Sequence, residues 1–152
     1  MTMAANWWPN PTTQEFRVAA ESAVIPESHA DLVERPVLAH VATLGPKGEP
    51  QNNPVWFEMK DGLIRFSQTT ARQKLRNVQR DGRVSFSIVD PENPYRYLEI
   101  RATLERIDPD PDFAFIDSMA KKYLGEDRYP WSQPGDERVV LNFRPEHTSQ
   151  MG

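Results

Sequence analysis

The residues best suited to chemistry in this sequence form a compact group of cations. Residues 71–83 read ARQKLRNVQRDGR and hold five Lys or Arg residues against one Asp, in a chain whose formal net charge is −4. Nucleic-acid binding usually needs a broad basic face, whereas one small cationic cluster on an acidic chain favours a phosphate-bearing small molecule. We therefore expect no nucleic-acid partner. The alternative interpretation is a basic helix face that is simply solvated.

The spacing of Arg72 and Lys74 limits how they can share a ligand. On a helix their side chains would lie about 200° apart, so they converge only if the chain is still extended at Arg72. We therefore predict that the helix begins near Gln73 or Lys74. An anion at this strand-to-helix transition would also meet free backbone N–H groups and the hydroxyls of Thr69 and Thr70.

A second candidate segment is residues 50–57, PQNNPVWF. Pro54 cannot donate a hydrogen bond to a neighbouring strand, so the strand that holds it lies at a sheet edge or contains a bulge. The free polar groups along such a strand can bind a planar ligand. The alternative is a proline at the rim of a barrel, with Trp56 packed in the core.

Other chemistries lack the residues that they require. The chain has no cysteine, and its three histidines, His29, His40 and His147, do not have the spacing of metal ligands. The sequence contains no G-x-S-x-G elbow, no G-x-G-x-x-G and no P-loop motif. We therefore expect no metal and assign no catalytic residue. His40 is interpreted as a core histidine in a buried strand.

The hydrophobic pattern predicts the elements that position these residues. Strands are predicted at 37–44, 52–58, 63–67, 83–89, 95–107 and 139–143, and short helices at 26–36, 69–80 and 113–123. Asp61-Gly62 lies between the second and third strands and indicates a hairpin, because both central residues of a type I′ turn need positive φ.

Six strands with short connections predict a mainly β fold with minor α, in which an antiparallel sheet closes into a small barrel with short flanking helices. The 152 residues are divided into an N-terminal arm (1–25), one barrel domain (26–148) and a tail (149–152). No segment reads as a membrane span or a signal peptide, so we expect a cytoplasmic protein with no membrane partner.

Sequence segments across about residues 26–148 resemble the split β-barrel flavin and deazaflavin oxidoreductases, the pyridoxamine 5′-phosphate oxidase-like superfamily. More narrowly, they resemble the branch that uses the deazaflavin coenzyme F-420. The segments are 39–44 (AHVATL), 48–51 (GEPQ), 54–57 (PVWF), 61–67 (DGLIRFS), 72–77 (RQKLRN), 80–84 (RDGRV), 95–100 (YRYLEI), 116–125 (IDSMAKKYLG) and 138–141 (RVVL).

This resemblance implies a six-stranded antiparallel split β-barrel of the FMN-binding type, which forms homodimers with cofactor sites at the subunit interface. It implies that Arg72 and Lys74 hold the cofactor phosphate, and that Tyr95 approaches the site of the partner subunit. The implied cofactor-binding residues are Pro54, Val55, Trp56, Ser67, Thr69, Thr70, Arg72, Lys74, Asn77 and Tyr95.

The function that the resemblance implies is an oxidoreductase that transfers hydride from reduced coenzyme F-420 to a small organic acceptor. Two alternatives stay open: an FMN-dependent oxidoreductase of the same fold, and a flavin or deazaflavin carrier without turnover. Both cofactors carry a ribityl phosphate, so Arg72 and Lys74 do not separate them. Vitamin B6 oxidation is not expected, because the chain lacks the C-terminal substrate-binding pattern of the pyridoxamine phosphate oxidases proper.

Overall fold

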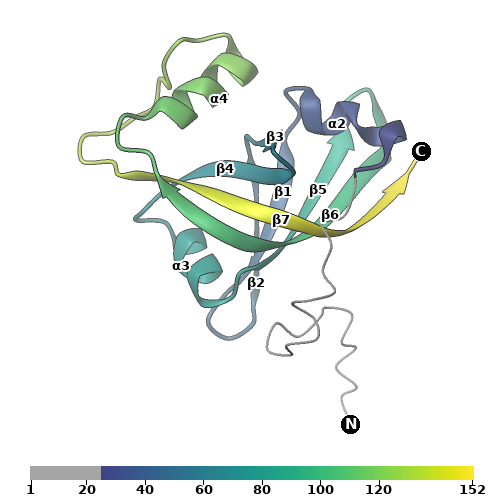
Figure 1. Cartoon of the computed structure of the whole chain (residues 1–152), viewed down its shortest axis with the longest axis horizontal. Coiled ribbons are helices and arrows are strands. Elements are labelled where there is room, and N and C mark those ends of the chain that lie inside the picture. Colours follow the sequence, from purple (N-terminus) through teal and green to yellow (C-terminus); the bar gives the residue numbers. More distant parts are fainter. Residues whose placement is uncertain (1–24) are drawn as a thin grey trace.

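The computed structural model describes residues 25–152, so the expected N-terminal arm lies almost entirely outside the described residues. The elements are η1 (Glu27–His29), α2 (Asp31–Glu34), β1 (Ala39–Leu44), β2 (Pro50–Val55), β3 (Glu58–Lys60), β4 (Leu63–Thr69), α3 (Gln73–Arg80), β5 (Arg83–Asp90), β6 (Asn93–Pro109), α4 (Ala114–Leu124) and β7 (Arg138–Met151). Strands dominate and the helices are short, as the sequence predicted (Figure 1).

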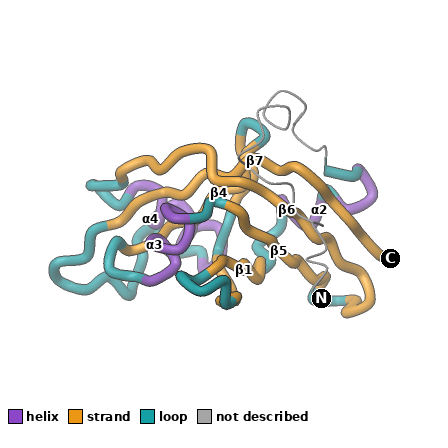
Figure 2. The backbone as a smooth tube through the Cα atoms, turned by 90° about the horizontal axis from the view of Figure 1, so that it is seen from below, coloured by secondary structure: helices purple, strands orange, loops and turns teal. Residues whose placement is uncertain are grey.

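The described strands form one antiparallel sheet in the order β2-β1-β5-β6-β7-β4-β3, so β2 and β3 are its two edges. In the chain, these edges are separated by Trp56 and Phe57 alone. Two residues cannot connect the two edges of a flat seven-stranded sheet, because each neighbouring pair of strands is about 4.8 Å apart. The sheet therefore curls until its edges approach each other, which gives a split β-barrel (Figures 1 and 2).

The sheet has seven strands, where the sequence analysis expected six. The predicted strand 52–58 is two strands, because the Phe57 N–H donates to the Tyr123 hydroxyl at 3.1 Å instead of to a neighbouring strand. Beyond this break, β3 pairs with β4 across Asp61 and Gly62, which both have positive φ. The hairpin prediction is confirmed, although the longer piece, β2, pairs with β1.

The barrel interior is filled by alternate residues of the strands. Phe66, Phe86 and Phe143, from β4, β5 and β7, are fully buried, and their ring centroids lie 5.5–6.1 Å apart. The alternation of β5 and β6 predicts inward faces of Val84, Phe86 and Ile88, and of Leu98, Ile100, Ala102 and Leu104; all are buried except Leu104, which is partly buried. This core is a rigid support for residues at the end of β4.

Two expectations from the sequence, one on the C-terminal tail and one on His40, are corrected by the structure. β7 continues to Met151, so most of the expected tail (149–152) is strand. His29 is buried and its Nε2–H donates to the Met151 carbonyl oxygen at 3.0 Å. His40 is exposed, so its interpretation as a core histidine is wrong: the alternation of β1 turns Val41 inward and His40 outward.

The start of α3 follows the cation spacing and not the periodicity, which predicted a helix over 69–80, and α4 lies within one residue of its predicted range. Arg72 has extended backbone angles (φ −84°, ψ 145°) and α3 begins at Gln73, as the spacing of the cations predicted. α4 ends at Gly125, whose φ of 74° is left-handed and stops the helix. The predicted helix 26–36 is two short pieces, η1 and α2. None of the described helices has the length and apolar character needed to cross a membrane.

Candidate functional site

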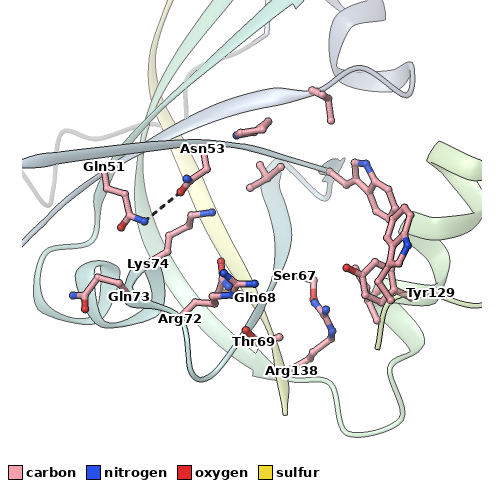
Figure 3. Close-up of a pocket in the computed structure, with 16 residues that line it drawn as sticks. Gln51, Asn53, Ser67, Gln68, Thr69, Arg72, Gln73, Lys74, Tyr129 and Arg138 are labelled. Carbon is pink, nitrogen blue, oxygen red and sulfur yellow. Dashed lines mark hydrogen bonds between the residues drawn. The ribbon is translucent and has the colours of Figure 1, made fainter. Parts of the chain in front are cut away.

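A cavity of about 620 Å³ lies beside the two-residue link that joins the edges of the sheet. It is lined by β2, the end of β4, the start of α3 and the loop before β7 (Figure 3). Seven residues from the predicted cofactor-binding set line it: Pro54, Val55, Trp56, Ser67, Thr69, Arg72 and Lys74. The two candidate segments of the sequence therefore belong to one site.

Lys74 is the most buried cation of this cavity, with 7% of the residue exposed. Its Nζ lies 5.6 Å from the centroid of the Phe66 ring, and within residues 25–152 the side chain forms no hydrogen bond or ion pair. Burial and the positive charge of Arg72 lower the pKa of Lys74 to about 8. A largely buried lysine whose ammonium has no partner among the described residues favours an anionic ligand, which would compensate the reduced hydration.

Arg72 lies at the same end of the cavity as Lys74 but is exposed. It is the residue directly before α3, and its extended backbone lets its side chain and that of Lys74 line one cavity. In Figure 3 both side chains lie close to Gln68 of β4. The geometry that the sequence required for a shared ligand is therefore present.

Arg138 is a third cation of the cavity, and the sequence analysis did not assign it. Its Nη1 donates to Ser67 Oγ at 3.1 Å, and its guanidinium lies 4.6 Å from the centroid of the Tyr129 ring. Its Nε is buried and has no hydrogen-bond partner among the described residues. Only the pairing register of β4 and β7 would have predicted it, because Arg138 begins β7 directly opposite Thr69, the last residue of β4.

Aromatic side chains form the opposite end of the cavity (Figure 3). We call Trp56, Tyr129 and Trp131 the aromatic wall. Trp56 meets Tyr129 edge-on at 5.9 Å and Trp131 at 6.0 Å between ring centroids, while its other contact is a stacked pair with Tyr123 at 5.3 Å. Trp131 is 56% exposed, and it lies with Tyr129 in the irregular segment between α4 and β7. That segment has no periodicity, so the sequence analysis missed both.

Asn77, also predicted to bind the cofactor, supports the cavity from behind. Its side-chain amide N–H groups donate to Thr43 Oγ1 at 3.1 Å and to Gln51 Oε1 at 3.0 Å. Its oxygen accepts hydrogen bonds from Gln73 at 2.9 Å and Arg80 at 3.3 Å. This buried amide therefore ties α3 to β1 and β2 and fixes Gln51, which does line the cavity.

Two further residues of the predicted set lie outside the cavity lining. The N–H of Thr70 donates to the carbonyl oxygen of Glu137 at 2.9 Å, so Thr70 fastens the end of β4 to the segment before β7. Tyr95 is 75% exposed near the start of β6. Its assignment to the site of a partner subunit stays a prediction.

The cavity thus has a cationic end and an aromatic end, with the side-chain amides of Gln51, Asn53 and Gln68 among its other polar residues. This arrangement suits a flat ring that carries a phosphate, because rings stack on aromatic surfaces while cations bind the phosphate. Within residues 25–152, no group of three or more His, Asp or Glu side chains is arranged to hold a metal ion.

Comparisons with known proteins are consistent with this geometry. Residues 25–152 match the family model described as pyridoxamine 5′-phosphate oxidase. A solved structure described as "F420 Reductase" is 42% identical, with a TM-score of 0.75 over 82% of this chain and 98% of its own. The conserved hypothetical protein Rv2991 from Mycobacterium tuberculosis is 25% identical, with a TM-score of 0.67 over 87% of each chain.

More distant structures share the fold alone. The heme storage protein HutZ from Vibrio cholerae is 15% identical, with a TM-score of 0.65 over 86% of this chain and 96% of its own. No curated protein matches the chain.

Proposed function

Because the chain belongs to the pyridoxamine 5′-phosphate oxidase family and has its split β-barrel fold, we propose that it is an oxidoreductase whose cavity binds coenzyme F-420. Its substrate is a small organic acceptor, which is reduced by hydride transfer. The similar structure described as an F420 reductase supports this choice of coenzyme. The observation that carries the proposal is Lys74, a buried and unpartnered cation that lines a cavity with an aromatic wall at its other end.

The cationic end has the donors that a phosphate requires. Lys74 and Arg72 would carry the charge compensation, and the Thr69 hydroxyl lies at the same end of the cavity. Arg138 brings a buried Nε–H with no partner among the described residues, next to the Ser67 hydroxyl. Charged donors that lack a protein partner bind phosphate strongly, since the hydrogen bonds formed are charge-assisted.

The aromatic end and β2 have the features that a flat ring requires. β2 is an edge strand, so one side of its backbone pairs with β1 and the other side pairs with no described strand. Pro54 and Val55 line the cavity at this free side, and Trp56 continues it into the aromatic wall. A ring placed along Pro54–Trp56 would therefore contact backbone polar groups at its edge and indole at its end.

Hydride transfer from the coenzyme does not require a nucleophile or a general base among the protein side chains. When bound, the reduced deazaflavin supplies a hydride from its ring carbon. Arg72 and Lys74 would hold the phosphate, β2 would orient the ring, and the aromatic wall would exclude water from the reacting face. The acceptor gains a proton together with the hydride, and solvent at the mouth of the cavity can supply it. We therefore assign no catalytic residue.

The test is a side-by-side titration of the protein with coenzyme F-420 and with FMN. Trp56 and Trp131 line the cavity, so binding should quench tryptophan emission, and Trp131→Phe should reduce the quenching without abolishing binding. Lys60→Ala is the matched charge control, because Lys60 is exposed on β3 and does not line the cavity. We expect micromolar or tighter binding of F-420 that Lys60→Ala leaves unchanged.

Each other outcome has a definite meaning. Preference for FMN would replace the proposal with the FMN-dependent alternative. Tight stoichiometric binding of F-420, without oxidation of the reduced coenzyme by any of a panel of activated alkenes and quinones, would indicate a carrier. Binding of neither cofactor would contradict the proposal and leave the cations as a solvated basic surface.

A further inference from the structure

Lys74 differs from the other lysines of the chain. The sequence has five lysines, all within the described residues: Lys47, Lys60, Lys74, Lys121 and Lys122. The Lys121 ammonium forms an ion pair with Asp127 at 3.2 Å, and the Lys122 ammonium donates to the Phe57 carbonyl oxygen at 2.9 Å. Lys47 and Lys60 are exposed. Lys74 alone is buried at a cavity without a hydrogen bond or ion pair among residues 25–152.

The surroundings of Lys74 increase the fraction of its side chain that is a neutral amine, although the ammonium form still predominates at pH 7. Phe66 lies against the ammonium group, and Arg72 is the charged neighbour that acts on it. In Figure 3 its side chain lies among Asn53 and Gln51 of β2 and Gln68 of β4, which are all uncharged. Burial and Arg72 together lower the pKa of Lys74 to about 8. A neutral lysine amine is a nucleophile, whereas the ammonium form is not.

The rest of the cavity selects which electrophile would reach this amine. Arg72 and Arg138 would attract an anionic group, and the aromatic wall would hold a flat frame. We propose that Lys74 is a covalent capture site for carbonyl compounds, specific for aldehydes that carry an anionic group on a flat aromatic or conjugated frame. The ligand class is thus set by three features of one cavity: a free amine, two further cations and an aromatic wall.

The capture step balances without an oxidant or reductant. The nitrogen lone pair of Lys74 attacks the carbonyl carbon, so that the C–N bond forms as the C=O π bond breaks, and one proton passes from the nitrogen to the oxygen to give a carbinolamine. Loss of the nitrogen proton and the hydroxyl group as one water molecule leaves an imine. Water reverses the reaction, so capture lasts only while the aldehyde is present at sufficient concentration.

This inference rests on the cavity and on the amine, and not on which cofactor binds there. A phosphate held by Lys74 would compete with the aldehyde, because the bound anion keeps the amine protonated. The two proposals therefore fail separately: F-420 binding tests the oxidoreductase proposal, and labelling of the cofactor-free protein tests this one.

The experiment uses 4-formylbenzoate as the probe and sodium cyanoborohydride, which reduces an imine to a stable secondary amine. After a short reaction at pH 7.5, peptide mapping by mass spectrometry gives the label at each lysine. We expect Lys74 to react about tenfold faster than Lys47 or Lys60, since its larger neutral fraction outweighs the lower nucleophilicity of a less basic amine. Inorganic phosphate should slow labelling at Lys74 alone.

Two comparisons test the role of the cavity. The uncharged probe 4-methylbenzaldehyde should label Lys74 several-fold more slowly than 4-formylbenzoate, and Arg138→Gln should reduce that difference. Lys122 is the matched internal control, because burial also lowers its pKa but its ammonium is hydrogen-bonded and it does not line the cavity. Lys74→Arg keeps the positive charge and should lose the label at that site while Lys122 is labelled as before.

Equal labelling of Lys74 and the exposed lysines would overturn the proposal, as would equal rates with the charged and uncharged probes. The labelling of Lys74 relative to that of Lys47 and Lys60 should fall as the pH rises above about 8, because the Lys74 amine is then already largely neutral; the ratio cancels the pH dependence of the reductant. A ratio that stays constant from about pH 7 to about pH 10 would identify Lys74 as an ordinary lysine and would also overturn the proposal. This pH profile needs no variant, so it stands even if a substitution disturbs the fold.

Discussion

At the scale of residues, the two ends of Lys74 have opposite effects on the protein. Its carbon chain is buried against the barrel, which supports α3, while its ammonium group is only partly hydrated and has no counter-charge among the described residues. Such an arrangement costs folding free energy, and a bound anion would recover part of it. This is the physical basis for two predictions.

The first prediction concerns binding of the coenzyme. Arg72→Ala and Lys74→Ala should each weaken F-420 binding by about 1–3 kcal/mol, the range for a lost hydrogen bond to a charged group. Isothermal calorimetry measures the change. Arg76→Ala is the matched control, because Arg76 lies on the same helix, bonds to Gln73 and does not line the cavity. Unchanged affinity in both cavity variants would contradict the phosphate role.

The second prediction concerns the free energy of unfolding as a function of pH. The pKa of Lys74 is lowered to about 8 in the folded protein from 10.5, so the unfolded chain binds more protons between these values. Stability should therefore rise with pH across this window, and the destabilisation should be complete below about pH 8. Lys74→Met should raise the free energy of unfolding at pH 7 by about 1–3 kcal/mol and remove this rise.

Urea unfolding of the wild type and of Lys74→Met at several pH values measures that difference. Subtracting one curve from the other removes the contributions of the titratable groups that the two proteins share. A difference that is constant from pH 7 to pH 10.5 would show that the lysine has an ordinary pKa.

The sequence could predict Arg72 and Lys74 because both lie in one local strand-to-helix transition. Arg138 could not be found in this way, since its partner Ser67 is 71 residues away and register is not visible in local spacing. The burial of His29 could not be predicted either, because its hydrogen-bond partner Met151 is 122 residues away. Local chemistry was predictable, and contacts between distant segments were not.

At the scale of elements, the break between β2 and β3 is the feature that shapes the cavity. Tyr123 of α4 holds this break, because its hydroxyl accepts from the Phe57 N–H and donates to the Val37 carbonyl oxygen at 2.7 Å. Its ring also stacks on Trp56. Periodicity predicted a continuous strand here because the hydrogen-bond partner that ends it lies 66 residues along the chain.

The third prediction follows from this contact. Tyr123→Phe leaves the Phe57 N–H and the Val37 carbonyl without their partner, so it should lower the free energy of unfolding by about 1–3 kcal/mol. It should also weaken F-420 binding, because the link of Trp56 and Phe57 loses the hydrogen bond that fixes it. Tyr97→Phe is the matched control, as the Tyr97 hydroxyl forms no hydrogen bond within residues 25–152. Equal stability of the two variants would show that the break does not depend on Tyr123.

The fourth prediction concerns the docking of α3. Asn77→Ala removes a buried amide whose donors and acceptor are all used, so Thr43 and Gln51 lose hydrogen-bond partners together. The free energy of unfolding should fall by at least about 2 kcal/mol in urea titrations. Arg76→Ala, on the exposed side of the same helix, should change it by less than about 0.5 kcal/mol. A small effect of Asn77→Ala would mean that packing alone docks α3.

At the scale of the whole molecule, three of the six exposed large apolar side chains in the described residues lie at one end of the long strands. Val89, Tyr95 and Met151 are all exposed, and Val89 and Met151 both lie opposite Tyr97 in neighbouring strands. Isolated apolar residues are normal on a surface, whereas a group on adjacent strand ends indicates an interaction site. This group includes the residue that was assigned to a partner subunit.

The fifth prediction is that the protein sediments as a homodimer at micromolar concentration, and that Tyr95→Arg shifts it toward the monomer. A charge placed in an apolar interface loses its hydration without gaining a partner. Leu124→Arg is the control, because Leu124 is an exposed apolar residue at the end of α4 rather than on the strand ends. A monomeric wild type would contradict the placement of Tyr95.

The seam between β4 and β7 also has a kinetic consequence. These strands pair Thr69 with Arg138, so the cavity joins parts of the chain that are far apart in sequence. Pairings between distant segments form late, because closing a long loop costs entropy before any contact repays it. Capture of a ligand by this cavity must then follow completion of the barrel. The rate of ligand binding during refolding would therefore measure when β7 pairs with β4, independently of when the earlier strands collapse.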